Sequence, residues 1–210
     1  MNNAWTEAGA DDFVKAHGPE RGVEVALLAY ATRLVGSEPD LAMHGGGNTS
    51  LKGAVRTLAG DDAAALFVKA SGAAMDGITP AGFVCLDLGY LVKLRSLSAL
   101  SDEVMAAEFG MHRLMPSDSL PSIETLMHAF IARRAVIHTH PTAILALTNR
   151  AGGETTVREA LGSAVGVIPY SGSGLALGRL ATDLHDRRKE LRAIVAMHHG
   201  LITWGTSLKM

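Results

Sequence analysis

Two segments of the sequence place histidines where they could bind a single metal ion. His138 and His140 are two residues apart in a segment of strand composition, so both side chains leave the same face of a strand. His198 and His199 end a second strand-like run, and only one of them can point toward that site, because adjacent strand residues face opposite ways. Three neutral imidazoles from two elements can bind zinc and leave a coordination position open for substrate. The alternative is a chance His-x-His pair and a polar turn with half-exposed histidines.

Glu124 is the carboxylate best placed to work beside such an ion. It lies in the first turn of a helix that the segment Pro121-Ser122-Ile123-Glu124 predicts, fourteen residues before His138. That length allows a helix to run and a strand to return, so the carboxylate can approach the metal. It could then act as a general acid and base, either displaced from the ion by substrate or just outside its coordination shell. The alternative is a glutamate that only stabilises the N-terminus of its helix.

Two glycine-containing segments could bind an anion. The run Gly45-Gly46-Gly47-Asn48-Thr49-Ser50 predicts a tight turn, and Ser71-Gly72 follows a predicted strand. Both offer backbone N–H groups and short polar side chains, which suit a phosphate or a carboxylate. Each segment taken alone is equally typical of an ordinary turn.

Two other glycine motifs do not support the chemistry that they first resemble. His44-Gly45-Gly46-Gly47 is similar to an oxyanion segment of α/β-hydrolases, but the sequence has no Gly-x-Ser-x-Gly nucleophile motif. Gly172-Ser173-Gly174 is similar to a dinucleotide-binding loop, but Leu177 stands where the third glycine belongs. We therefore expect neither a serine hydrolase nor a dinucleotide site there.

Hydrophobic periodicity predicts the elements that must position these residues. After an irregular opening of twenty residues, the expected helices cover 19–36, 102–114, 123–134, 142–149 and 175–190. The expected strands are 41–44, 55–58, 66–70, 135–140, 165–170, 193–197 and 201–204. This alternation predicts one α/β or α+β domain over 1–210, with a sheet covered by helices and some antiparallel pairing near its end.

Composition excludes several classes of protein. A chain of 210 residues with 48% hydrophobic and 19% charged residues is globular, and its net charge of −2 disfavours nucleic-acid binding. The single cysteine, Cys85, lies in an apolar run and fits a reducing compartment. Because the sequence shows neither a signal peptide nor a membrane-spanning stretch, we expect a cytoplasmic protein without a membrane partner.

Taken together, five motifs resemble the class II aldolase/adducin family over nearly the whole chain. They are His-Gly-Gly-Gly-Asn-Thr-Ser at 44–50, Lys-Ala-Ser-Gly at 69–72, Pro-Ser-Ile-Glu at 121–124, His-Thr-His at 138–140 and His-His-Gly at 198–200. The glycine-rich loop is most similar to that of the aldolase portion of bifunctional aldolase/short-chain dehydrogenase proteins. The sequence contains no dehydrogenase portion.

The resemblance implies a three-layer α/β/α fold with a largely antiparallel central sheet, often in a homotetramer with active sites at subunit contacts. It implies that the metal ligands are His138, His140 and His199, because the family histidine directly precedes the glycine, and that Glu124 is the catalytic carboxylate. The phosphate-binding residues that it implies are Gly47, Asn48, Ser71, Gly72 and Ser122. The longer glycine loop leaves phosphate and carboxylate both open as the anion. Family members generally continue into a further helix, whereas this sequence ends eleven residues after His199, so a short member and a fragment are both open.

The activity that these features imply is reversible aldol cleavage of a phosphorylated ketose or a related hydroxy acid through an enediolate. Zn²⁺ is the expected ion, with Mn²⁺ or Co²⁺ as other divalent choices, and a sugar phosphate is the expected small-molecule partner. One alternative is a sugar-phosphate epimerase that cleaves and rejoins the same bond. Another is an adducin-like binding domain without catalysis.

Overall fold

A mixed sheet forms the centre of the molecule. The computed structural model describes residues 3–43, 46–116 and 119–209. Within these residues the sheet has seven strands in the order β3-β2-β1-β4-β7-β6-β5, and all neighbours are antiparallel except the parallel pair β5 and β6. The strands are β1 (Asn48–Arg56), β2 (Asp62–Lys69), β3 (Phe83–Asp87), β4 (Ala135–Thr139), β5 (Val165–Ile168), β6 (Ala193–Ala196) and β7 (Gly200–Gly205). The expected largely antiparallel sheet is therefore confirmed.

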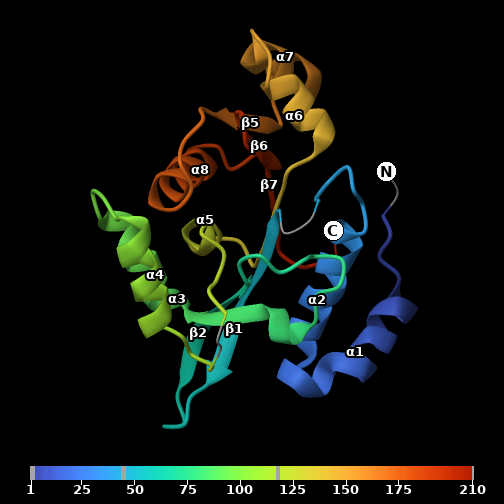
Figure 1. Ribbon diagram of the computed structural model, residues 1–210, viewed down its shortest axis with the longest axis vertical. Coiled ribbons are helices and arrows are strands. Elements are labelled where there is room, and N and C mark those ends of the chain that lie inside the picture. Colours follow the sequence, from blue (N-terminus) through green and yellow to red (C-terminus); the bar gives the residue numbers. More distant parts are fainter. Residues whose placement is uncertain (1–2, 44–45, 117–118, 210) are drawn as a thin grey trace.

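Helices cover both faces of this sheet (Figure 1). One layer contains α3 (Leu88–Lys93), α4 (Asp102–Met111), α5 (Thr125–Phe130) and α8 (Leu175–Arg187). The other contains α1 (Glu7–Arg21), α2 (Val23–Gly36), α6 (Thr142–Thr148) and α7 (Gly153–Leu161). Two short 3₁₀ turns, η1 (Pro80–Gly82) and η2 (Leu94–Ser96), complete the described elements. The chain has the three-layer α/β/α arrangement that the family resemblance implied.

The β2 strand shows why the sheet needs both helical layers. Leu66 and Val68 pack into the core beneath α3, α4 and α5, whereas Ala65 and Phe67 pack against α2. A strand alternates its side chains between two faces, so a strand covered on both sides is apolar at consecutive positions. The run 64–68 therefore lacks the alternation of apolar and polar residues that is typical of a strand with one solvent-exposed face.

The N-terminal region differs from the prediction. The opening residues form α1 rather than an irregular segment, and α2 is a separate helix that begins after Gly22. The Gly22 φ of 88° lies in the left-handed region and breaks the helical path between them. Among its described side chains, α1 buries only Ala10, so its apolar periodicity is faint in the sequence. No helix within the described ranges is long and apolar enough to cross a bilayer.

The segment after the glycine run also differs. Asn48, Thr49 and Ser50 begin β1, whereas the prediction placed them in a tight turn. Gly47, with φ 74°, makes the turn directly before them. The predicted strand at 55–58 is wrong in its second half, because β1 ends at Arg56 and a hairpin turn follows. Residues 41–43 form a turn and irregular chain rather than a strand, and His44 lies outside the described residues.

The helix after Glu124 is shorter than predicted. Thr125 is the first residue of α5 and Phe130 the last, so Glu124 directly precedes the helix instead of lying in its first turn. The Ser122 hydroxyl accepts a hydrogen bond from the Glu124 N–H at 3.3 Å, which holds this segment in its turn before the helix. Ile131 then adopts an extended conformation that ends α5 early and lets the chain turn toward β4. The other predicted helices and strands agree with the structure apart from their ends.

Candidate active site

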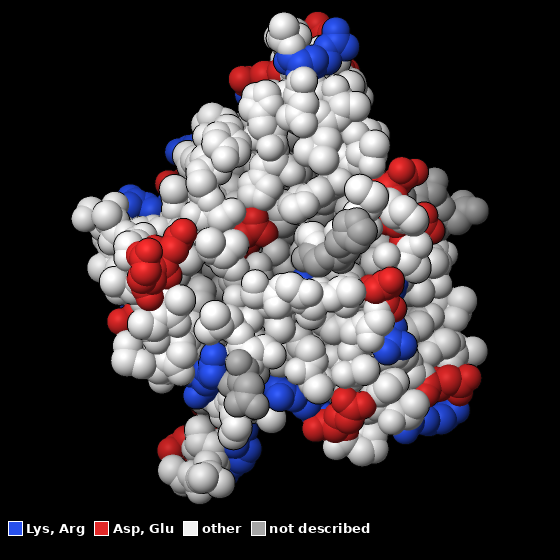
Figure 2. Space-filling view, in the orientation of Figure 1, with Lys and Arg blue, Asp and Glu red and all other residues white. Residues whose placement is uncertain are grey.

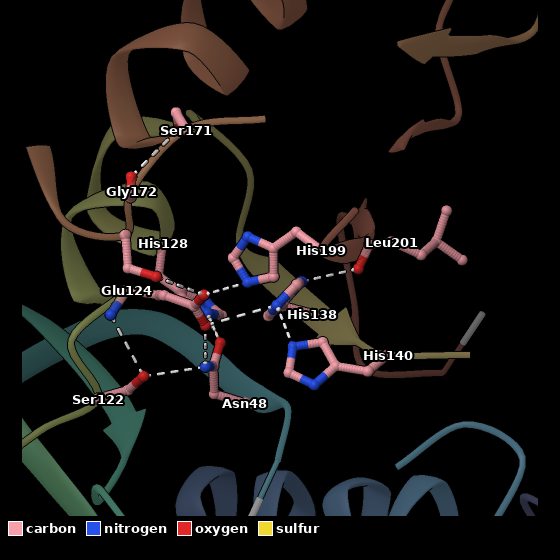
Figure 3. Close-up of polar contacts among 11 residues, drawn as sticks. Asn48, Ser122, Glu124, His128, His138, His140, Ser171, Gly172, His199 and Leu201 are labelled. Atoms are coloured by element: carbon pink, nitrogen blue, oxygen red, sulfur yellow. Dashed lines mark hydrogen bonds and ion pairs between the residues drawn. The ribbon is translucent and has the colours of Figure 1, made fainter. Parts of the chain in front are cut away.

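Three histidines meet at the end of the central strands. His138 is in β4, His140 directly follows this strand, and His199 lies in the turn between β6 and β7. Their candidate ligand atoms all lie within 4.8 Å of one another, and the Nε2 atoms of His138 and His140 are 3.0 Å apart. The three rings point toward one another in Figure 3. This arrangement could hold one metal ion.

A left-handed turn separates the two adjacent histidines. His198 has a φ of 58°, and the His199 N–H donates to the Ala196 carbonyl at 3.2 Å. His199 therefore turns inward, whereas the His198 Nδ1 lies 3.0 Å from the Asn149 Oδ1 at the surface. Of this pair, only His199 lies with His138 and His140, and a turn rather than strand alternation separates it from His198.

The Glu124 carboxylate lies directly beside the histidines. Its Oε1 is 2.8 Å from the His199 Nε2, and its Oε2 is 3.5 Å from the His138 Nε2. The Ser173 hydroxyl donates to Oε1 at 3.3 Å from the loop before α8. The side chain is only 7% exposed, so it does not serve merely as a surface charge at a helix end.

Asn48 joins the carboxylate to the sheet. It lies opposite His138 in the pairing of β1 with β4, and its Nδ2 donates to the Glu124 Oε2 at 2.6 Å. The same Nδ2 lies 2.9 Å from the Ser122 Oγ, so two of the predicted substrate-binding residues contact each other. Figure 3 shows these side chains on one side of the carboxylate and the histidines on the other.

Burial sets the charges of these groups. It lowers the pKa of His138 to about 4 and also lowers the pKa of His140, because burial disfavours the imidazolium. Burial alone raises the pKa of Glu124, but hydrogen bonds from His199 and Asn48, which remain when His138 is neutral, help to lower it. These contacts favour an ionised carboxylate, whereas burial favours the neutral forms of His138 and His140. Neutral imidazoles are the form that binds a divalent cation, so these residues fit the implied metal.

The other predicted anion-binding residues have less direct positions. Gly47 packs against the β4 backbone, where an added Cβ would lie 2.9 Å from the His138 carbonyl oxygen. Ser71 and Gly72 form an exposed turn after β2, and the Ser71 N–H donates to the Leu120 carbonyl at 2.8 Å. This turn therefore lies beside the segment that leads to Ser122, and its role in binding substrate stays a prediction.

The sequence analysis missed two residues of this site. His128 contacts Asn48 through its Nε2, and its position four residues after Glu124 is the signal that could have found it. Ser173 belongs to the Gly172-Ser173-Gly174 motif, which was considered only as a dinucleotide loop. Its contact with Glu124 depends on the packing of α8 against α5, which the sequence does not reveal.

Gly200 is required where the two metal-site segments approach each other. A Cβ at this position would lie 2.4 Å from the Thr139 carbonyl oxygen and 2.9 Å from the His140 ring. We expect Gly200→Ala to lower the free energy of unfolding by about 1–3 kcal/mol, the usual cost of overpacking. Chemical denaturation measures this change, and Gly172→Ala is the control because a Cβ there meets nothing within 4 Å. Equal stability of both variants would contradict the close approach.

The face of the molecule that Figure 2 shows carries its charges mostly at its edge. Lysine, arginine, aspartate and glutamate side chains are interspersed there, and the middle consists largely of other residues. The formal charge of the whole chain is −2. The face in Figure 2 therefore shows no continuous basic surface of the kind that attracts an extended polyanion.

The fold and the site define an α/β protein with a histidine cluster suited to a divalent cation. The family model for the Class II Aldolase and Adducin N-terminal domain matches residues 26–210. The chain therefore belongs to this family, and the expected resemblance is confirmed.

Comparisons with individual proteins agree with this assignment. The N-terminal class II aldolase domain of a conserved protein from Thermoplasma acidophilum is 32% identical, with a TM-score of 0.86 over 100% of this chain and 91% of that one. The L-fuculose-1-phosphate aldolase from Thermus thermophilus shares the fold, with 18% identity and a TM-score of 0.52 over 87% of this chain and 82% of that one.

One curated relative is much longer than this chain. The uncharacterized oxidoreductase YuxG of Bacillus subtilis (strain 168) is 30% identical over 194 residues, which are 92% of this chain. The chain covers only 28% of the length of YuxG. This match agrees with the predicted likeness to the aldolase portion of bifunctional proteins.

Proposed function

We propose that the chain is a metal-dependent aldolase that reversibly cleaves a phosphorylated ketose or a related hydroxy acid. The observation that carries this proposal is the convergence of His138, His140 and His199 around one point, with the Glu124 carboxylate 2.8 Å from His199. Family membership supports the proposal. The L-fuculose-1-phosphate aldolase with the same fold supports a sugar phosphate as the substrate class.

The three histidines would hold Zn²⁺, or Mn²⁺ or Co²⁺ in its place. When bound, a divalent ion supplies Lewis-acid stabilisation of the negative charge that develops on substrate oxygens during cleavage. Glu124 would move the proton at the adjacent carbon, because its carboxylate is ionised, nearly buried and within reach of the same space. Asn48 holds the Oε2 of this carboxylate, which limits the directions in which Glu124 can accept the proton.

Anion binding completes the proposed substrate site. Gly47, Asn48, Ser71, Gly72 and Ser122 would bind the phosphate or carboxylate of the substrate through backbone N–H groups and short polar side chains. Ser122 and Asn48 link this anion site to the carboxylate, since both make hydrogen bonds to Glu124. The substrate would therefore extend from the turn at Ser71 toward the histidines.

Metal analysis followed by a substrate screen tests the proposal. We expect about one divalent ion per chain, the stoichiometry that a single three-histidine site requires. Incubation with ketose phosphates should release an aldehyde, which a coupled dehydrogenase detects. An epimeric sugar without free aldehyde would instead indicate an epimerase, whereas metal binding without any turnover would indicate a non-catalytic binding domain.

We also propose that the protein is cytoplasmic, as its sequence features predict, and that it is a homotetramer, as the family resemblance implies. The expected result of light scattering on the purified protein is a mass near four times the 22.0 kDa of the chain. A monomer with full activity would contradict a role of subunit contacts in the active site.

A further inference from the structure

A buried chain of hydrogen bonds continues from the carboxylate away from the metal site. The Glu124 Oε2 accepts from the Asn48 Nδ2, and the Asn48 Oδ1 contacts the His128 Nε2. The other ring nitrogen of His128, Nδ1, lies 2.7 Å from the Ser50 hydroxyl. Both ring nitrogens of His128 are thus engaged by Asn48 and Ser50. In the part of the chain that the structure describes, no hydrogen bond joins His128 to the three clustered histidines.

The orientation of the Asn48 amide fixes the direction of the hydrogen bonds in this chain. The Asn48 atom that faces the Glu124 Oε2 is the amide nitrogen, which only donates. The Asn48 atom that faces His128 is the amide oxygen, which only accepts. The His128 Nε2 must consequently carry a proton. In a neutral imidazole the Nδ1 is then an acceptor, and Ser50 donates its hydroxyl proton to it.

Because these residues are buried, each of them must keep the hydrogen-bond partner described above. His128 and Ser50 are fully buried, Asn48 is 4% exposed and Glu124 is 6% exposed, so water does not replace a lost partner easily. Leaving one buried polar group unpaired costs more free energy than a typical hydrogen bond contributes. Burial also lowers the pKa of His128 to about 3, which keeps the imidazole neutral under ordinary conditions.

We propose that His128 is a positioning residue that fixes the Asn48 amide and, through it, the Glu124 carboxylate. Without the Nε2 donor, the buried Asn48 oxygen loses its partner and the amide loses the contact that holds it on this side. The Asn48 nitrogen would then hold the Glu124 Oε2 less firmly in place. The expected effect on turnover rests on the proposed function. The assignment of donors and acceptors from Glu124 to Ser50 does not.

The protonation pattern of His128 is measurable without any activity. Long-range ¹H–¹⁵N correlation spectra of the full chain labelled at histidine distinguish the two neutral tautomers, and the His128→Gln variant assigns the signal. We expect the Nε2–H tautomer both with and without Zn²⁺. An Nδ1–H tautomer would overturn the proposal, because the Asn48 oxygen would then face an unprotonated nitrogen.

Three variants test the consequence for proton transfer. The assay is exchange of a carbon-bound proton of dihydroxyacetone phosphate with D₂O by the zinc-loaded protein. His128→Leu removes the donor and should lower kcat for exchange by about 10- to 100-fold, with KM and zinc content unchanged, as for loss of a supporting partner. His128→Gln keeps an N–H donor in the region of Nε2 and should restore most of the rate.

His185→Leu is the matched control for loss of a buried histidine. His185 is 1% exposed and packs against Trp204, away from Glu124. A merely structural role of His128 predicts equal loss of stability in both leucine variants and an unchanged kcat per bound zinc. That result, or a glutamine variant as slow as the leucine variant, would overturn the positioning role. If the wild-type protein showed no exchange, that result would contradict the proposed function. The tautomer of His128 would still decide whether the donors and acceptors are assigned correctly.

Discussion

Glu124→Gln is expected to keep about one metal ion per chain and to lower turnover by about 10²- to 10⁴-fold, the usual contribution of a general acid or base. Glutamine has nearly the same shape and can still accept from Asn48 through its amide oxygen. It cannot take a proton under ordinary conditions, so the variant separates proton transfer from assembly of the site. Metal analysis and steady-state kinetics on the best substrate of the screen measure the two effects.

Glu108→Gln is the control for this substitution. Glu108 is a half-buried glutamate in α4. It accepts a hydrogen bond from Tyr90 in the neighbouring helix α3. It should retain wild-type turnover, because it lies outside the proposed site. Full activity in Glu124→Gln would remove the proposed role of the carboxylate, and loss of metal from this variant would instead make Glu124 a ligand.

His199→Asn is expected to abolish stoichiometric zinc binding and the thermal stabilisation that comes with it. A ligand that binds only the folded state at 100 times its Kd stabilises that state by about 2.7 kcal/mol. For a chain of this size, that energy corresponds to a Tm increase of about 5–11 °C. The wild-type protein should show this increase when zinc is added to protein treated with a chelator, whereas the variant should show none.

The neighbouring histidine offers a close control. His198 has a positive φ and points to Asn149 at the surface, and asparagine tolerates this backbone conformation better than most residues. His198→Asn should therefore keep both the zinc and the increase in Tm. Equal loss in both variants would indicate a damaged turn rather than a lost ligand, and unchanged binding in His199→Asn would remove His199 from the ligand set.

Much of the site could be predicted because its residues follow simple local rules. The His138–His140 spacing places both rings on one side of a strand end. Only one histidine of the 198–199 pair was expected to face these rings, because the side chains of adjacent residues point apart. The apolar runs in β4, β6 and β7 were long enough to place these histidines at strand ends.

Features that depend on tertiary packing were not predictable in the same way. Asn48 was expected in a turn, because glycine-rich sequence hides the start of β1, and only pairing with β4 makes this segment a strand. The spacing of His128 from Glu124 could have indicated that the two residues share one side of the segment, but it does not show that the His128 ring reaches across to Ser50 in β1. The α1 helix was missed because Ala10 is its only buried described side chain.

The pairing of Asn48 with His138 has a consequence for how preparations of this protein are judged. A slip of one residue between β1 and β4 would move the Asn48 side chain to the opposite face of the sheet. The three imidazoles come from β4 and from the β6–β7 hairpin, so a slipped molecule would keep its cation while Glu124 lost its amide donor. If the proposed metal site is right, zinc content would report how many molecules have closed the hairpin side of the sheet. Only active-site titration would count the molecules that are fully assembled.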